Sequence, residues 1–171
     1  MIFAWPDIVD ARTTDIDFGP TNWRTITREQ VDLFASVTGD LPIVYIDPER
    51  AKIEGPFGGM VAHGFLLLSM MPVLLAERIV LPPEAIIVNY GLGNLRFTTA
   101  VRVGERIRGR FLLKARNRIE PSKTILKIRA TIEVENGRRP AVVADPLIML
   151  VQFGMDHSLA GMRQSADLAF D

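Results

Sequence analysis

Residues 34–69 read FASVTGDLPIVYIDPERAKIEGPFGGMVAHGFLLLS, and this stretch decides how the chain folds. Turn-forming residues gather twice in it, at residues 38–42 and 55–59, before an apolar run begins at His63 and Gly64. Glycine, proline and aspartate at this density break regular structure, whereas the apolar run that follows is typical of a buried helix. The stretch therefore predicts two turns that lead into a central helix.

The segment before these turns has the signals of an amphipathic helix. Thr27 is followed three residues later by Gln30, which is the spacing of a capping box. Gly39 stands where a glycine commonly ends a helix. We therefore expect a helix over residues 28–37.

Two more helices are expected further along the stretch. Asp47 and Pro48 have the order of a capping residue and a first helical residue, which predicts a short helix. The run from residue 63 or 64 to residue 79 is apolar on nearly every side, so it is expected to form one long buried helix. Pro72 should bend this helix, and residues 81–83 should end it.

Beyond residue 85 the sequence alternates between apolar and polar residues, which is typical of strands that are buried on one face. Asn136 and Gly137 form a strong hairpin-turn signal, and the glycines at 91 and 93 predict a bulge. The first 20 residues are expected to be irregular because prolines and a glycine interrupt them. The expected strands cover residues 85–97, 105–116, 124–134 and 141–153.

Helices followed by antiparallel strands predict an α+β fold in which a long central helix packs on a sheet. The 171 residues are enough for one domain with its own core. We expect this domain to cover residues 1–155, followed by a C-terminal tail over residues 156–171.

The composition excludes several classes of function. The chain has 20 basic and 20 acidic side chains, so its formal net charge is zero, which argues against nucleic acid as a partner. The longest apolar run, residues 65–75, is far shorter than the roughly 20 residues that span a membrane. The N-terminus lacks the basic start of a secretory signal. We therefore expect a cytoplasmic protein with no membrane partner.

The sequence also lacks the residues that most cofactor and metal sites need. It has no cysteine and only two histidines, His63 and His157, so a transition-metal site is not expected. Neither of the two glycine-rich nucleotide-binding motifs occurs in it. We expect no metal and no cofactor.

Several separate motifs nevertheless fall in one order: residues 34–69, then Val-Asn-Tyr-Gly at 88–91, Arg-Phe at 96–97 and Val-Gly-Glu at 103–105. In this respect residues 20–150 resemble the MaoC-like branch of (R)-specific enoyl-CoA hydratases, and within it the nodulation protein N group. The resemblance implies a hot-dog fold, in which an antiparallel sheet wraps around a long central helix. It also implies a homodimer whose substrate is carried as a thioester of coenzyme A or of a carrier protein.

The resemblance also implies a catalytic residue, Asp40, in the Gly-Asp sequence after the first helix. In the family a histidine follows five residues later, and the two residues together hold the water that adds across the double bond. This chain has Tyr45 at that position, and Pro42 where the family usually has an asparagine. About one tyrosine in 1,000 is ionised at pH 7, so Tyr45 is a poor base but a competent hydrogen-bond donor. The apolar residues around Asp40 in the sequence predict a buried carboxylate, which needs a partner or a function.

Four more residues are candidates. The resemblance implies that the backbone amide of Gly64 polarises the thioester carbonyl, as free amides at a helix start favour developing negative charge. The alternative is a glycine required for close packing. His63, Asn89 and Arg96 are candidate substrate-binding residues. A histidine such as His63 is more often structural and hydrogen-bonded than an acid or base, and surface or dimer contacts explain Asn89 and Arg96 equally well.

Three functions remain open at this point. The first is reversible hydration and dehydration of an enoyl or 3-hydroxyacyl thioester, by Asp40 as base or water ligand with Tyr45 as its altered partner. The second is a biosynthetic tailoring enzyme, such as a dehydratase or cyclase that acts on a polyketide-like substrate. The third is a subunit without catalytic activity that binds acyl groups.

Overall fold

The main layer of the protein is a six-stranded sheet with the strand order β2-β6-β7-β8-β5, in which β3 also pairs with β6. The computed structural model describes residues 2–10 and 15–153, so the expected tail at 156–171 and His157 lie outside the described residues. All the strand pairs of this sheet are antiparallel. Its strands are β2 (Ile16–Pro20), β3 (Arg24–Thr25), β5 (Ala85–Phe97), β6 (Arg106–Glu120), β7 (Lys123–Val134) and β8 (Val142–Gln152).

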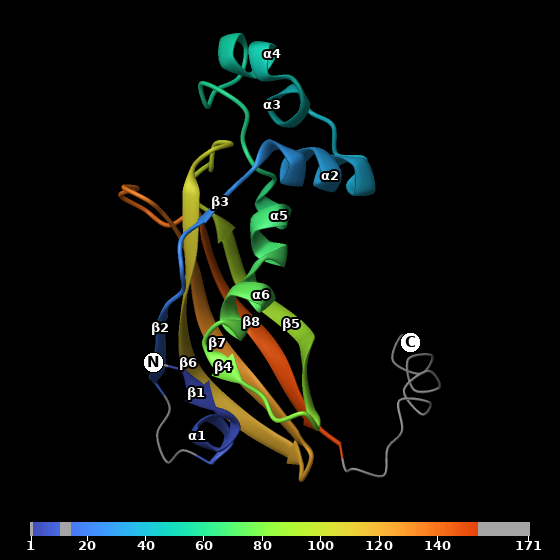
Figure 1. The fold of residues 1–171 in the computed structure, drawn as a ribbon, viewed down its shortest axis with the longest axis vertical. Helices are drawn as coiled ribbons and strands as arrows, with labels where there is room; N and C mark the ends of the chain where they lie inside the picture. The colour runs from blue at the N-terminus through green and yellow to red at the C-terminus, as the bar shows by residue number, and fades with distance from the viewer. Residues whose placement is uncertain (1, 11–14, 154–171) are drawn as a thin grey trace.

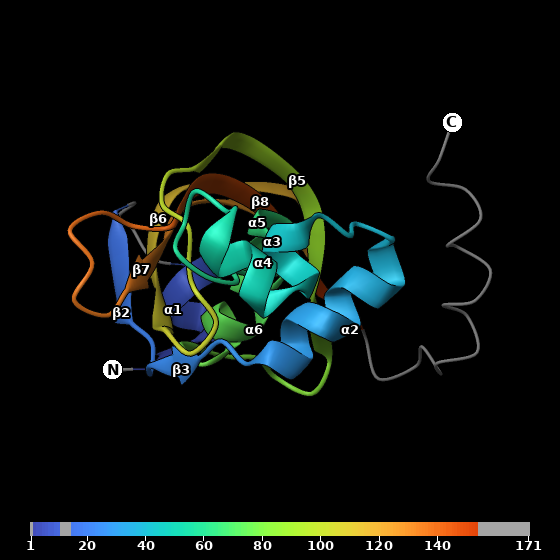
Figure 2. The ribbon, with the colours of Figure 1, turned by 90° about the horizontal axis from the view of Figure 1, so that it is seen from above.

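The helices α2 to α6 lie in two places relative to this sheet. Two of them lie along its inner face, and Figure 2 shows the sheet curving around them. Three others stand above one end of the sheet, at the top of Figure 1. The inner pair is α5 (Gly64–Ser69) and α6 (Met71–Ala76), and the upper group is α2 (Arg28–Thr38), α3 (Ile43–Ile46) and α4 (Pro48–Ile53).

The core lies between the sheet and the inner helices. Alternate residues of β6 and β7 are buried, among them Phe111, Ile128 and Ile132, and they pack with Leu74 of α6. The intervening residues of these strands lie largely on the outer face, as the alternation predicted. The expected bulge in β5 is confirmed by two register shifts, one on each side of Gly91 and Gly93.

The prediction of one long helix bent at Pro72 is wrong in detail, because α5 ends and α6 begins around Met70. Proline has no amide hydrogen, and its ring excludes the carbonyl four residues earlier, so the helix breaks in the turn before Pro72. Pro72 itself sits in the first turn of α6, where its missing donor costs nothing.

The prediction that residues 1–20 are irregular is also wrong. They contain β1 (Phe3–Ala4), α1 (Trp5–Val9) and β2, and β1 pairs in parallel with β4 (Ile79–Val80). The partners of β1 and β2 lie more than seventy residues away along the chain, so no local pattern reveals them. Gly19 and Pro20 are tolerated because β2 is an edge strand of the sheet.

Candidate active site

The candidate site begins directly after the end of helix α2. Its start is closed by the expected capping box, in which the Gln30 amide donates to Thr27 Oγ1 at 3.2 Å and the Thr27 amide donates to Gln30 Oε1 at 3.0 Å. Its end is closed by Gly39, which takes a left-handed φ of +71° and donates its amide to the Ala35 carbonyl at 2.8 Å. A side chain at this position would be strained, so glycine turns the chain here and places Asp40 directly after the helix.

Asp40 is not buried as the sequence predicted. Its side chain is 53% exposed, and Val37 and Leu41, which suggested an apolar environment, are themselves exposed. The turn at Gly39 brings the chain to the surface, so Val37 and Leu41 do not enclose the carboxylate. Water therefore reaches the carboxylate from one side, and the protein contacts it from the other.

His63 lies on the protein side of Asp40. The His63 side chain is almost fully buried, and its Nε2 atom is 3.0 Å from the Asp40 carbonyl oxygen and 4.0 Å from Asp40 Oδ2. A carbonyl oxygen only accepts hydrogen bonds, so Nε2 is the atom that carries the hydrogen. The other ring nitrogen, Nδ1, is buried and has no hydrogen-bond partner among the described residues.

Tyr45 comes to the site on α3, a four-residue helix that the sequence analysis missed. Its ring stacks on the ring of His63, with centroids 3.7 Å apart and an interplanar angle of 30°. Phe34 of α2 contacts the same imidazole, with centroids 5.0 Å apart. Burial, together with the negative charge of Asp40, raises the pKa of the Tyr45 phenol. The phenol is therefore neutral at neutral pH and able to donate a hydrogen bond.

Gly64 is the first residue of α5, where backbone amides have no acceptor within the helix. A Cβ atom on Gly64 would lie 2.8–2.9 Å from three ring carbons of Phe97, which is closer than packed atoms approach. Glycine is therefore needed at this position for close packing against β5. Because α5 has only six residues, its dipole is small, and the amide itself is the group that favours an anion.

One cavity of about 440 Å³ is lined by Asp40, Tyr45, His63 and Gly64. Three partly exposed aromatic residues also line it: Phe57, Phe65 and Phe97. The rings of Phe65 and Phe97 meet edge to face, with centroids 5.3 Å apart. The volume lies within the range of small-molecule sites. None of the three phenylalanines was predicted as a site residue, although the glycine at position 64 was a signal that a side chain packs against it.

The structure does not bring the remaining two candidates to this cavity within one chain. Asn89 lines a second cavity of about 410 Å³, next to Ser69 and Tyr90. Arg96 is exposed and donates from Nη1 to the Leu95 carbonyl at 2.7 Å. Any role for these two side chains at Asp40 would have to involve a second copy of the chain.

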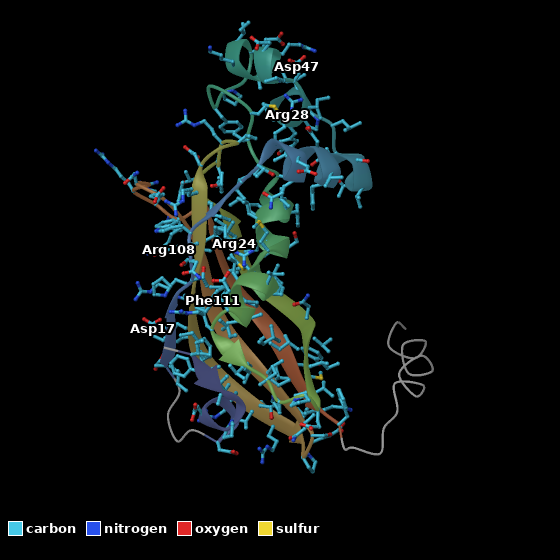
Figure 3. All side chains as sticks on the ribbon, viewed as in Figure 1. Asp17, Arg24, Arg28, Asp47, Arg108 and Phe111 are labelled. Atoms are coloured by element: carbon cyan, nitrogen blue, oxygen red, sulfur yellow. The ribbon has the colours of Figure 1, made fainter. Side chains whose placement is uncertain are left out.

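A row of arginines on β6 is occupied by carboxylates. Arg106 pairs with Glu135 at 2.8 Å, and Arg110 pairs with Asp17 at 2.9 Å. Arg108 pairs with Glu133 at 2.7 Å and covers the ring of Trp23, and Figure 3 places it on the side of the molecule opposite α2. This row is therefore a solvated face with its charges paired. No helix among the described residues is long and apolar enough to cross a membrane.

Comparison with known proteins gives consistent matches. Residues 10–136 match the model of the MaoC like domain. The chain is 37% identical to nodulation protein N of Rhizobium leguminosarum bv. viciae over 138 residues, which cover 80% of this chain and 85% of that protein. It is 38% identical to 3-hydroxyacyl-thioester dehydratase Z of Mycobacterium tuberculosis over 133 residues, which cover 78% of this chain and 87% of that protein.

A solved structure with the same architecture is the MaoC-like dehydratase from Rhodospirillum rubrum, with a TM-score of 0.68 at 16% identity. The match covers 86% of this chain and 98% of that one. It confirms the expected antiparallel sheet curved around a central helical segment. The chain therefore belongs to the MaoC-like domain family and has its hot-dog fold.

Proposed function

We propose that this protein catalyses the reversible hydration of an enoyl thioester to a 3-hydroxyacyl thioester. The observation that carries the proposal is that one cavity contains a carboxylate, Asp40, a neutral phenol, Tyr45, and a backbone amide at a helix start, Gly64. One similar protein is named as a 3-hydroxyacyl-thioester dehydratase, which supports the same reaction here.

The reaction needs one group that moves a proton and one that stabilises an oxyanion. In hydration, Asp40 takes a proton from water while the water oxygen bonds to C3 of the enoyl thioester. The electron pair of the double bond moves to the thioester carbonyl, whose oxygen accepts a hydrogen bond from the Gly64 amide. Asp40 then returns the proton to C2 and the carbonyl re-forms. Dehydration follows the same steps in reverse.

Tyr45 acts in this scheme as a donor. As a base it would start about 4 kcal/mol behind a group with a pKa near 7, because its own pKa is near 10 before any shift. The raised pKa of Tyr45 makes it a worse base still but keeps its hydrogen available. In the dehydration direction, the phenol donates to the departing hydroxyl oxygen and helps it leave as water.

We propose that the acyl group is carried by coenzyme A or by an acyl carrier protein, and that the protein is a homodimer. Strand β5 lies at one end of the sheet order, and its residues Val88, Tyr90 and Leu92 are exposed. An unpaired edge with exposed apolar side chains is suited to pairing with a second copy. The molar mass in solution tests this, and a Tyr90→Glu variant should be monomeric.

The experiment for the activity is hydration of short and medium trans-2-enoyl-CoA, measured by loss of the enoyl absorbance, for the wild type and for Tyr45→His. Turnover by the wild type supports the proposal. No turnover by the wild type together with turnover by the Tyr45→His variant contradicts the proposal. The rest of the site would then support hydration, and the tyrosine would have changed the chemistry.

A second candidate is cyclisation of a polyketide-like thioester. The aromatic side chains of Phe57, Phe65 and Phe97 favour it, because flat unsaturated substrates stack on such rings. Silence of both the wild type and Tyr45→His with every enoyl-CoA would favour this candidate, or a subunit that only binds acyl groups. Turnover of a cyclisable thioester would then separate these two.

A further inference from the structure

His63 touches every part of the proposed catalytic apparatus without itself being exposed. Its Nε2 atom is hydrogen-bonded to the backbone of Asp40, its ring is stacked on Tyr45, and it is bonded covalently to Gly64. We propose that His63 is the positioning residue of the site, and that it holds Asp40 and Tyr45 in a fixed position relative to the Gly64 amide. The inference rests on the proposed function and goes beyond it by assigning this residue.

The hydrogen bond fixes the backbone from which the carboxylate projects. Asp40 follows the end of α2, and its amide makes only a long contact of 3.4 Å with Thr38 Oγ1. The bond from His63 Nε2 at 3.0 Å is shorter and joins residues 23 positions apart in the chain. Because the donor is buried, water competes little for this bond. The bond therefore connects an exposed turn to the first residues of α5.

The stacking of the Tyr45 ring on His63 fixes the position of Tyr45. No residue of α3 is fully buried, and the helix is held by half-buried side chains and by the Val61 amide, which donates to the Val44 carbonyl at 3.0 Å. The imidazole lies against the Tyr45 ring on one side, and Phe34 of α2 also contacts it. Because both segments meet at a single buried ring, the ring can fix their geometry relative to each other, even though α2 is largely exposed and α3 only half-buried.

The chemistry of the side chain argues against simple space filling. His63 leaves Nδ1 buried without a partner among the described residues, and such an atom costs stability. A phenylalanine would fill similar space and stack on Tyr45 without that cost. What phenylalanine lacks is the Nε2–H donor, so the hydrogen bond to Asp40 is the property that distinguishes histidine here.

Two substitutions separate the hydrogen bond from the stack. His63→Gln places an amide nitrogen near the position of Nε2 and keeps the donor without the ring. His63→Phe keeps the ring without the donor. We expect His63→Phe to lower kcat on the order of 10²-fold with a smaller change in KM, because a misplaced catalytic group costs about that much. His63→Gln should recover most of the loss in kcat.

Hydrogen exchange measured by mass spectrometry gives a readout that does not depend on activity. Peptides that cover residues 40–47 should exchange faster in His63→Phe than in the wild type, and close to the wild-type rate in His63→Gln. If the wild type shows no turnover, the proposed function fails, but the exchange rates still decide the role of His63.

A second pair of variants covers the case in which His63→Phe does not fold. His63→Asn is as polar as His63→Gln, but its shorter side chain puts the amide near Nδ1, where it does not reach the Asp40 carbonyl. The asparagine variant should therefore exchange fast over residues 40–47, unlike the glutamine variant. The inference is overturned if His63→Phe and His63→Asn keep the wild-type exchange rates and kcat. It is also overturned if His63→Gln and His63→Asn lose slow exchange, kcat and thermal stability to the same extent.

Discussion

The sheet with its inner helices and the group formed by α2, α3 and α4 are held together in different ways. In the sheet, long antiparallel strands bury alternate side chains, and residues such as Phe111 and Ile128 are fully enclosed. In the upper group, α2 buries only Val31 and Ala35, α4 buries only Ala51, and α3 buries nothing. Local caps and a few cross-contacts, including the His63 bond, hold that group in place.

This difference separates stability from chemistry. Buried apolar area dominates the free energy of folding, so most of the stability of this protein comes from the sheet and the inner helices. The groups that we assign to the reaction sit where the upper group meets the start of α5. Changes in the sheet should therefore alter stability and leave the chemistry intact, and changes at the junction should do the opposite.

The largest effect is expected in the sheet. Phe111→Ala removes a buried ring from β6 and should lower the free energy of unfolding by about 3–5 kcal/mol. Urea unfolding followed by tryptophan fluorescence measures this loss. The folded fraction should keep its kcat. A large fall in kcat without unfolding would contradict the claim that the sheet contributes stability and not chemistry.

The next effect is expected at the junction. Gly64→Ala places a Cβ atom against the ring of Phe97, and because that ring is partly exposed it can move aside. We expect kcat to fall about 10- to 10²-fold, since the wall of the cavity and the donor amide shift relative to each other, while the melting temperature changes little.

The double variant Gly64→Ala with Phe97→Leu is the matched control for this substitution. The smaller leucine makes room for the added methyl group, so part of the lost kcat should return. Equal rates for the single and double variants would show that the Phe97 contact is not the reason for the glycine.

A smaller effect is expected from the phenol. Tyr45→Phe keeps the stack on His63 but removes the donor, and kcat should fall about 10-fold or more. Because the Tyr45 pKa is raised and the protonated form is the active one, wild-type activity should fall only as pH rises beyond about 10, the ordinary pKa of tyrosine. The pH profile of kcat checks both points, and an alkaline fall that persists in Tyr45→Phe would assign it to another group.

The smallest effect concerns a carboxylate in the sheet. Asp145 is almost fully buried, and hydrogen bonds from Asn94 at 2.6 Å and Arg129 at 3.0 Å lower its pKa. Because the pKa of Asp145 is lower in the folded protein than in the unfolded chain, the ionised carboxylate stabilises the fold at pH values above its ordinary pKa. This stabilisation is lost as the pH falls through the pKa of the folded state, so acid should destabilise the wild type below about pH 4. Asp145→Asn should flatten this part of the dependence of the melting temperature on pH, and an unchanged dependence would contradict the assignment.

Local patterns in the sequence predicted the sheet well. The alternation in β6 and β7, the turn at Asn136 and the bulge near Gly91 are properties of neighbouring residues, and all three are confirmed. The capping box and Gly39 at the ends of α2 are local in the same way. The strands β1 and β2 were missed because their partners are distant in the chain.

The site was only partly predictable, because its geometry depends on contacts across the fold. The motif named Asp40, Tyr45, His63 and Gly64, and all four line one cavity. It did not reveal that Asp40 is exposed, because burial depends on the direction in which the turn at Gly39 leaves the helix. Phe97 was missed as a wall of the cavity because its contact with Gly64 joins residues 33 positions apart.

The most direct test of the central claim is hydration of trans-2-enoyl-CoA by the wild type and by Asp40→Asn, with the melting temperature of each. Asp40 is half exposed and lies outside the core, so the asparagine variant should melt within a few degrees of the wild type. Its kcat should fall about 10²- to 10⁴-fold, the usual contribution of a general acid–base group. Wild-type turnover that survives in Asp40→Asn would contradict the account, because the reaction would then occur without the carboxylate on which it depends.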